Sequence, residues 1–154
     1  MQTRLNPYTT APEVMKPMID LEAAFKKASI EPTIIELVKI RASQINGCAY
    51  CLHMHTKDAR AAGETEARIY LLSAWRESRL YTARERAALE WTEALTLIAD
   101  THAPDAAYEA VKAVFSPKEI VELTMLIGAI NTWNRIAIGF RSVHPEDAKN
   151  AAAA

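Results

Sequence analysis

The chain has 154 residues, of which half are hydrophobic and 24% are charged, and its formal net charge is −1. This length suffices for one domain with a core of its own, and the composition excludes a disordered chain. No excess of basic residues is present to neutralise phosphates, so we expect no nucleic-acid partner.

Apolar residues recur at helical spacing, and no window alternates apolar and polar residues as a half-buried strand would. The sequence therefore predicts an all-α fold of six to seven helices in one domain of residues 1–146, followed by a flexible tail at 147–154. The expected helices span residues 14–27, 32–46, 48–63, 64–79 and 82–99, a short stretch after Pro104, and a long apolar segment that ends near Phe140.

Local signals support several of these boundaries. Gly47 is typical of the position just past a helix end, and Pro17 is expected in a first turn. Thr82 with Glu85, and Ser116 with Glu119, match the capping box that opens a helix.

The segment at residues 120–140 is long enough to span a bilayer, but it contains Glu122, Asn131, Asn134 and Arg135, which are costly in lipid. We expect a buried or interface helix there, with Trp133 in the core or at a subunit contact, and no membrane association. A helix that is apolar on nearly all sides also favours a homo-oligomer. Because residues 1–7 lack the apolar stretch of a secretory signal, the expected location is cytoplasmic.

Both cysteines of the chain lie close together, in the sequence Cys48-Ala-Tyr-Cys51, and His55 follows. On a helix Cys51 projects roughly 60° and His55 roughly 20° from Cys48, whereas His53 projects roughly 140° away. The first three share one face, and we assign His53 no catalytic role. Cysteines at this spacing have Cα atoms about 5 to 6 Å apart, which a disulfide accepts.

A helix N-terminus and an imidazole both stabilise a thiolate, which is the nucleophilic form of cysteine. Cys48 would gain more from the helix amides and Cys51 more from His55, so geometry leaves their division of roles open. An acidic residue from the preceding helix could orient the imidazole, as in catalytic triads. Glu36 is the candidate and Glu31 the alternative, while His102 and His144 fall near loops and are expected to be solvated.

Other interpretations of this cluster are a pair of small buried hydrophobes, or a zinc site made by Cys48, Cys51, His55 and Glu36. Structural zinc usually takes a second, distant pair of ligands, and the chain has no further cysteine. A thiol redox centre is therefore the leading interpretation.

The pattern of Glu36, Cys48-x-x-Cys51 and His55 resembles the signature of the alkylhydroperoxidase (AhpD-like) branch of the carboxymuconolactone decarboxylase family. The segment Ile130-Asn-Thr-Trp-Asn-Arg135 also resembles the closing helix of that family. Members that perform the decarboxylation generally lack the cysteine pair. Some members carry histidine where Tyr50 stands, which leaves a role for Tyr50 in proton transfer open.

This resemblance implies a homo-oligomeric helical protein, a trimer or hexamer, that reduces hydroperoxides. Cys51 would be the peroxidatic cysteine, Cys48 the resolving cysteine, His55 the base, and Glu36 the residue that completes the proton relay. No bound cofactor is implied. A dithiol donor, such as a lipoyl group on an acyl-transferase partner, would reduce the disulfide. A redox sensor switched by the same disulfide is the alternative.

Overall fold

The computed structural model describes residues 2–146, and within this range every regular element is a helix. The α-helices are α1 (Pro7–Thr10), α2 (Pro12–Ala24), α3 (Pro32–Asn46), α4 (Ala49–Ala61), α5 (Glu66–Leu71), α6 (Ala83–Thr96), α7 (Ile98–Thr101), α8 (Asp105–Lys112) and α9 (Pro117–Phe140). Short 3₁₀ turns follow α2 at Phe25–Lys27 and α5 at Leu72–Ala74. The all-α prediction is confirmed, and the tail expected at 147–154 lies outside the described residues.

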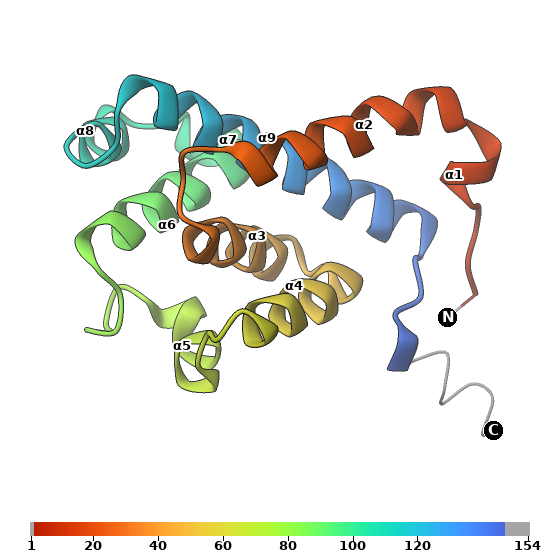
Figure 1. Cartoon of the computed structure of the whole chain (residues 1–154), viewed down its shortest axis with the longest axis horizontal. Helices are drawn as coiled ribbons and strands as arrows, with labels where there is room; N and C mark the ends of the chain where they lie inside the picture. The colour runs from red at the N-terminus through yellow and green to blue at the C-terminus, as the bar shows by residue number, and fades with distance from the viewer. Residues whose placement is uncertain (1, 147–154) are drawn as a thin grey trace.

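Helix α3 lies at the centre and packs against α4, α6 and α9 (Figure 1). Ile34 and Val38 contribute to a core shared with α6, α8 and α9, whereas Leu37 and Ile40 contribute to a second core shared with α4, α6 and the 3₁₀ turn after α5. Burying a side chain of this size stabilises the fold by about 1.5–3 kcal/mol. With buried residues in two cores, α3 is a fixed platform for the helix that follows it.

Gly47 makes the turn that reverses the chain between α3 and α4. Its φ of +70° lies in the left-handed region, where glycine has no Cβ penalty. The Cys48 amide then donates to the Ser43 carbonyl at 3.0 Å, which satisfies a carbonyl in the last turn of α3. The resulting helical hairpin places Cys48 immediately before the first residue of α4.

The helix expected at residues 64–79 is shorter than predicted. It ends as α5 at Leu71, and Trp75 lies beyond the 3₁₀ turn although it is buried as expected. The Arg86 guanidinium donates to the carbonyls of Trp75 and Ser78, at 2.9 and 3.0 Å. These hydrogen bonds from α6 hold the non-helical segment that follows the 3₁₀ turn.

Two further boundaries differ from the sequence predictions. The helix expected at 82–99 ends at Thr96 and is followed by the separate α7, and α2 begins at Pro12, so that Pro17 lies in its interior beyond the first turn. Helix α1 was not predicted. It begins where the Asn6 side chain accepts the Tyr8 amide at 3.0 Å, a cap too local to give apolar periodicity. These short elements raise the number of α-helices in residues 2–146 to nine, against the six to seven expected.

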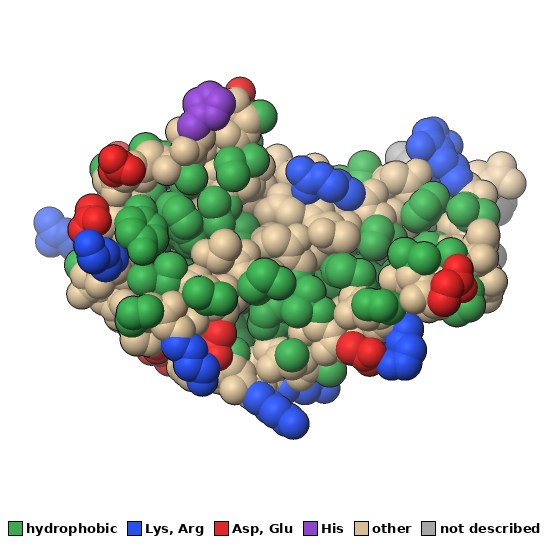
Figure 2. Space-filling model, turned by 90° about the horizontal axis from the view of Figure 1, so that it is seen from above, with side chains coloured by type: hydrophobic (Ala, Val, Ile, Leu, Met, Phe, Trp, Pro, Cys, Tyr) green, Lys and Arg blue, Asp and Glu red, His purple; other side chains and the backbone are tan. Residues whose placement is uncertain are grey.

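Both predicted capping boxes are present, at Thr82 with Glu85 and at Ser116 with Glu119. The second opens α9, which buries Leu123, Leu126 and Ile130 but leaves Val121 and Met125 exposed. Across the described residues, no helix is both long and apolar enough to cross a membrane. The space-filling view shows hydrophobic side chains gathered on the face that carries α2 and α8 (Figure 2).

Candidate functional site

Cys48 and Cys51 are joined as a disulfide, with their Cα atoms 5.4 Å apart, as the helical spacing predicted. Cys48 is the N-cap of α4, and its Sγ accepts the amide of Cys51 at 3.3 Å. Both residues are almost fully buried and pack against Ala137 of α9. The sulfur of Cys48 therefore lies where unpaired helix amides stabilise negative charge once the bond is reduced.

His55 lies one helical turn beyond Cys51 on α4, and its imidazole meets Glu36 of α3. The distance from His55 Nδ1 to Glu36 Oε2 is 3.0 Å. The side chain of His55 is 8% exposed and that of Glu36 is 22% exposed, so the pair is shielded from most of the solvent. Because the carboxylate is an acceptor, it favours the tautomer with the proton on Nδ1 and leaves Nε2 free to act as a base.

The alternative acidic residue, Glu31, takes another partner. Its carboxylate accepts a hydrogen bond from Nε of Arg84 at 2.8 Å, at the solvent-exposed start of α3. Of the two candidates, the structure therefore brings Glu36 to the histidine.

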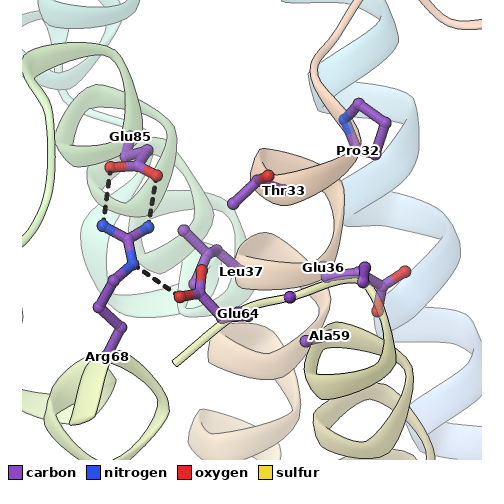
Figure 3. A pocket seen from close by; sticks show the side chains of 10 residues that line it. Pro32, Thr33, Glu36, Leu37, Ala59, Glu64, Arg68 and Glu85 are labelled. Carbon is purple, nitrogen blue, oxygen red and sulfur yellow. Dashed lines mark hydrogen bonds and ion pairs between the residues drawn. The ribbon is translucent and has the colours of Figure 1, made fainter. Parts of the chain in front are cut away.

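A pocket of about 220 Å³ lies beside Glu36, between the start of α3 and the end of α4 (Figure 3). On its other side Arg68 pairs with Glu64 and Glu85, at 2.8 and 2.5 Å. Burial of the Glu85 carboxyl acts to raise its pKa, but the Arg68 guanidinium and the Thr82 amide outweigh this and lower it. The pocket is too small for a large ligand and holds space for several water molecules beside Glu36; His55 is not one of its lining residues.

The remaining histidines lie apart from this pair. The rings of His53 and His144 are stacked, with centroids 5.1 Å apart and planes 18° from parallel, so His144 is not simply solvated as expected. His102 is exposed at the end of α7, in agreement with the prediction.

Tyr50 and Tyr8 are two phenols that the sequence could not relate. Partial burial raises the pKa of Tyr8, and the nearby Tyr50 raises it further, so α1 brings a second phenol toward the start of α4. Because Tyr8 lies on α1, which the sequence did not predict, its position near Tyr50 was not predictable either.

The zinc interpretation gains no ligand set from the fold. Within residues 2–146, no group of three or more His, Cys, Asp and Glu side chains is arranged to hold a metal ion.

Comparison with known proteins extends these observations. Residues 12–94 match the model of the carboxymuconolactone decarboxylase family, and this range includes Glu36, both cysteines and His55. The chain belongs to this family. The resemblance first indicated by the cysteine motif is therefore confirmed.

Relatives of the family support the same assignment. YdfG of Bacillus subtilis strain 168, an uncharacterised protein, is 49% identical over 138 residues, which cover 90% of this chain and 94% of YdfG. The structure of ATU0492 from Agrobacterium tumefaciens, a protein of unknown function provisionally assigned as the antioxidant defence protein AhpD, matches with a TM-score of 0.90. Its identity is 52%, covering 94% of this chain and 99% of that chain.

An uncharacterised peroxidase-related protein from Silicibacter sp. TM1040 matches with a TM-score of 0.78 and 21% identity, over 88% of this chain and 72% of that one. This likeness concerns the fold alone. Family membership and the paired cysteines together fit a peroxidase-like or redox role.

Proposed function

We propose that this protein is a thiol-dependent peroxidase of the alkyl hydroperoxide reductase type. The observation that carries the proposal is the placement of Cys48 and Cys51 at the start of α4, with His55 one turn farther along the same helix and paired with Glu36 of α3. Such a group contains a nucleophile, a base and an acidic residue that orients the base.

In the first step the Cys51 thiolate attacks the terminal oxygen of a hydroperoxide. An S–O bond forms, the O–O bond breaks, and the alcohol leaves after taking up a proton; Cys51 becomes a sulfenic acid. His55 receives the thiol proton on Nε2 before the attack, and Glu36 stabilises the resulting imidazolium through Nδ1.

In the second step the Cys48 thiolate attacks the sulfenic sulfur, which forms the Cys48–Cys51 disulfide and releases water. An external dithiol then reduces this disulfide through a mixed disulfide and is itself oxidised. A lipoyl group carried by a partner protein is a suitable donor of this class. These steps require no bound cofactor, and the chemistry suits a reducing compartment such as the cytoplasm.

We further propose that the protein assembles into a trimer or hexamer. Support comes from the exposed apolar side chains of α2 and α9, among them Val14, Ile19, Val121 and Met125. A face of this kind is usually covered by another protein surface.

The decisive experiment is hydroperoxide consumption with dihydrolipoamide as the dithiol donor. Wild type should complete many turnovers per subunit, and Cys51→Ser should abolish them. Cys48→Ser should allow one oxidation of Cys51 and block recycling through the intramolecular disulfide. Full steady-state activity of the Cys51→Ser protein would overturn the mechanism.

The same assay separates an enzyme from a redox sensor. A sensor would consume about one peroxide per subunit and would change its size or its binding partners on oxidation. Repeated turnover with a dithiol and an unchanged oligomeric state would favour the enzyme.

A further inference from the structure

Helix α9 carries two asparagines, Asn131 and Asn134, in a stretch that is otherwise largely apolar. Asn134 is 0% exposed and Asn131 is 9% exposed. An amide buried without hydrogen-bond partners costs about 1–3 kcal/mol, so side chains of this kind are stable in a core only where their partners are in place. One partner that they share, Asn46, lies two residues before Cys48.

The side chain of Asn134 forms hydrogen bonds to two residues in the last turn of α3. Its Nδ2 donates to Ser43 Oγ at 3.0 Å, and its Oδ1 accepts from Asn46 Nδ2 at 2.8 Å. Asn46 Nδ2 also donates to Asn131 Oδ1 at 2.9 Å. Helix α9 is thereby hydrogen-bonded to both Ser43 and Asn46.

The same two residues bound the turn that positions Cys48. The Ser43 carbonyl accepts the Cys48 amide, and Asn46 directly precedes Gly47, the residue with positive φ. One turn farther along α9, Ala137 packs against both cysteines. Helix α9 therefore hydrogen-bonds to two side chains of the last turn before Cys48 and contacts the cysteines themselves.

Asn131 anchors this arrangement to the rest of the fold. Its Nδ2 donates to Thr96 Oγ1 at 3.1 Å and to the Ile127 carbonyl at 2.9 Å, while Arg135 donates to its Oδ1 at 3.1 Å. The α3–α4 turn is therefore connected by hydrogen bonds to α9 and, through Asn131, to Thr96 at the end of α6.

We propose that Asn46 and Asn134 are positioning residues that hold the reduced Cys48 and Cys51 thiols at disulfide-forming distance. The catalytic importance of this positioning role rests on the proposed peroxidase function. The disulfide equilibrium that tests the role can be measured without peroxide. The disulfide breaks during each cycle, and after that only the surrounding structure limits how far Cys48 can move. A rigid turn keeps the effective concentration of one thiol at the other high, which favours oxidation and speeds the resolving step.

The test uses the glutathione redox equilibrium of the purified full-length protein. Asn134→Leu and Asn46→Ala should each lower the equilibrium constant for forming the Cys48–Cys51 disulfide by about tenfold, which corresponds to about 30 mV for this two-electron couple. After one equivalent of hydroperoxide, the sulfenic acid of each variant should also live longer and be trapped to a greater extent by a carbon nucleophile.

The matched control is Thr124→Val. It removes another interhelical hydrogen bond of α9, from Trp91 Nε1 to Thr124 Oγ1 at 3.0 Å, and leaves the α3–α4 turn untouched. This variant should keep the wild-type disulfide equilibrium even if it is less stable. An equal shift in Thr124→Val would overturn the proposal, because the effect would then follow general stability.

Asn46 is only half-buried, so its replacement by alanine should perturb folding less. If Asn134→Leu does not fold, the disulfide equilibrium of Asn46→Ala tests the positioning role. A folded Asn46→Ala protein with the wild-type equilibrium overturns the proposal. If wild type lacks hydroperoxide turnover but both variants shift the equilibrium, the peroxidase function fails and the positioning role stands.

Discussion

His55 and Glu36 are joined across two consecutive antiparallel helices, with Nδ1 of the imidazole 3.0 Å from the carboxylate. The contact depends on the reversal of the chain at Gly47, since a continuous helix would place these residues far apart. It also occupies Nδ1 and so leaves Nε2 as the imidazole nitrogen that can act as a base.

Replacing Glu36 by glutamine should slow hydroperoxide turnover by about tenfold to a hundredfold. The amide oxygen of glutamine can still accept a hydrogen bond from Nδ1–H of His55, but it carries no charge to stabilise the imidazolium. The Cys51 thiolate is then less favoured, and the acid limb of the pH–rate profile should move to higher pH. Steady-state rates measured across the pH range test this prediction.

Glu31→Gln is the matched control for that variant, because Glu31 also stands near the start of α3 but pairs with Arg84. Its profile should coincide with that of wild type. An unchanged profile in Glu36→Gln would remove Glu36 from the relay.

The site was predictable to the extent that its signals are local. The spacing of Cys48, Cys51 and His55 lies within one helix, and Gly47 marks the reversal that returns the chain toward Glu36. The choice of Glu36 over Glu31 follows from how far each lies along α3, which the spacing alone left open. Asn134 could not be assigned a partner, because its contacts with Ser43 and Asn46 join residues far apart in the chain.

Glu93 is predicted to be a major contributor to stability. Burial acts to raise the pKa of this carboxyl, but hydrogen bonds from Trp75 and Arg41 outweigh it and lower the pKa below 4.5. Both donors lie 2.8 Å from Glu93 Oε1. Glu93→Gln should lower the free energy of unfolding at neutral pH by about 1–3 kcal/mol, as measured by urea denaturation.

The pH dependence has a defined sign. Because the folded-state pKa is lowered, the ionised Glu93 stabilises the protein above its ordinary pKa, and this contribution is lost as the pH falls below it. The difference between wild type and Glu93→Gln should therefore shrink in acid. Glu90→Gln, which affects only a more exposed pair with Arg76 at 3.5 Å, should change stability by less than about 0.5 kcal/mol. A loss as large as that of Glu93→Gln would contradict a specific role for Glu93.

The helix boundaries show the same division between local and long-range causes. Both capping boxes were predictable, because each is complete within four consecutive residues. The irregular segment after α5 was not, because it is held by Arg86 of α6, which donates to the carbonyls of Trp75 and Ser78. Periodicity predicts a helix where an apolar face recurs, and it does not detect a competing partner from another element.

Glu119 provides a second pH-dependent contribution, at the start of α9. Hydrogen bonds from Ser116 and Arg84 lower the pKa of its carboxyl from 4.5 to about 2. Its stabilising effect is complete above the ordinary value and is lost as the pH falls toward 2. Glu119→Gln should cost about 1 kcal/mol at neutral pH, because glutamine keeps the capping box but loses the charge.

Denaturation at several pH values tests this prediction, and the cost should disappear as the pH approaches the folded-state value. Glu109→Gln is the control, since Glu109 forms an exposed pair with Lys112. A constant difference between Glu119→Gln and wild type down to low pH would contradict the assignment.

A charge placed on the exposed apolar part of α9 should disrupt the proposed assembly. Val121 is 63% exposed, and Val121→Glu would bury an unpaired carboxylate if this face is covered by another subunit. We expect wild type to elute as a trimer or hexamer and Val121→Glu as a smaller species, by size-exclusion chromatography with light scattering. Leu80→Glu is the control, because Leu80 is also exposed but lies in the loop before α6. Wild type that stays monomeric at high concentration would contradict the assembly, and an unaffected Val121→Glu oligomer would place its interface elsewhere.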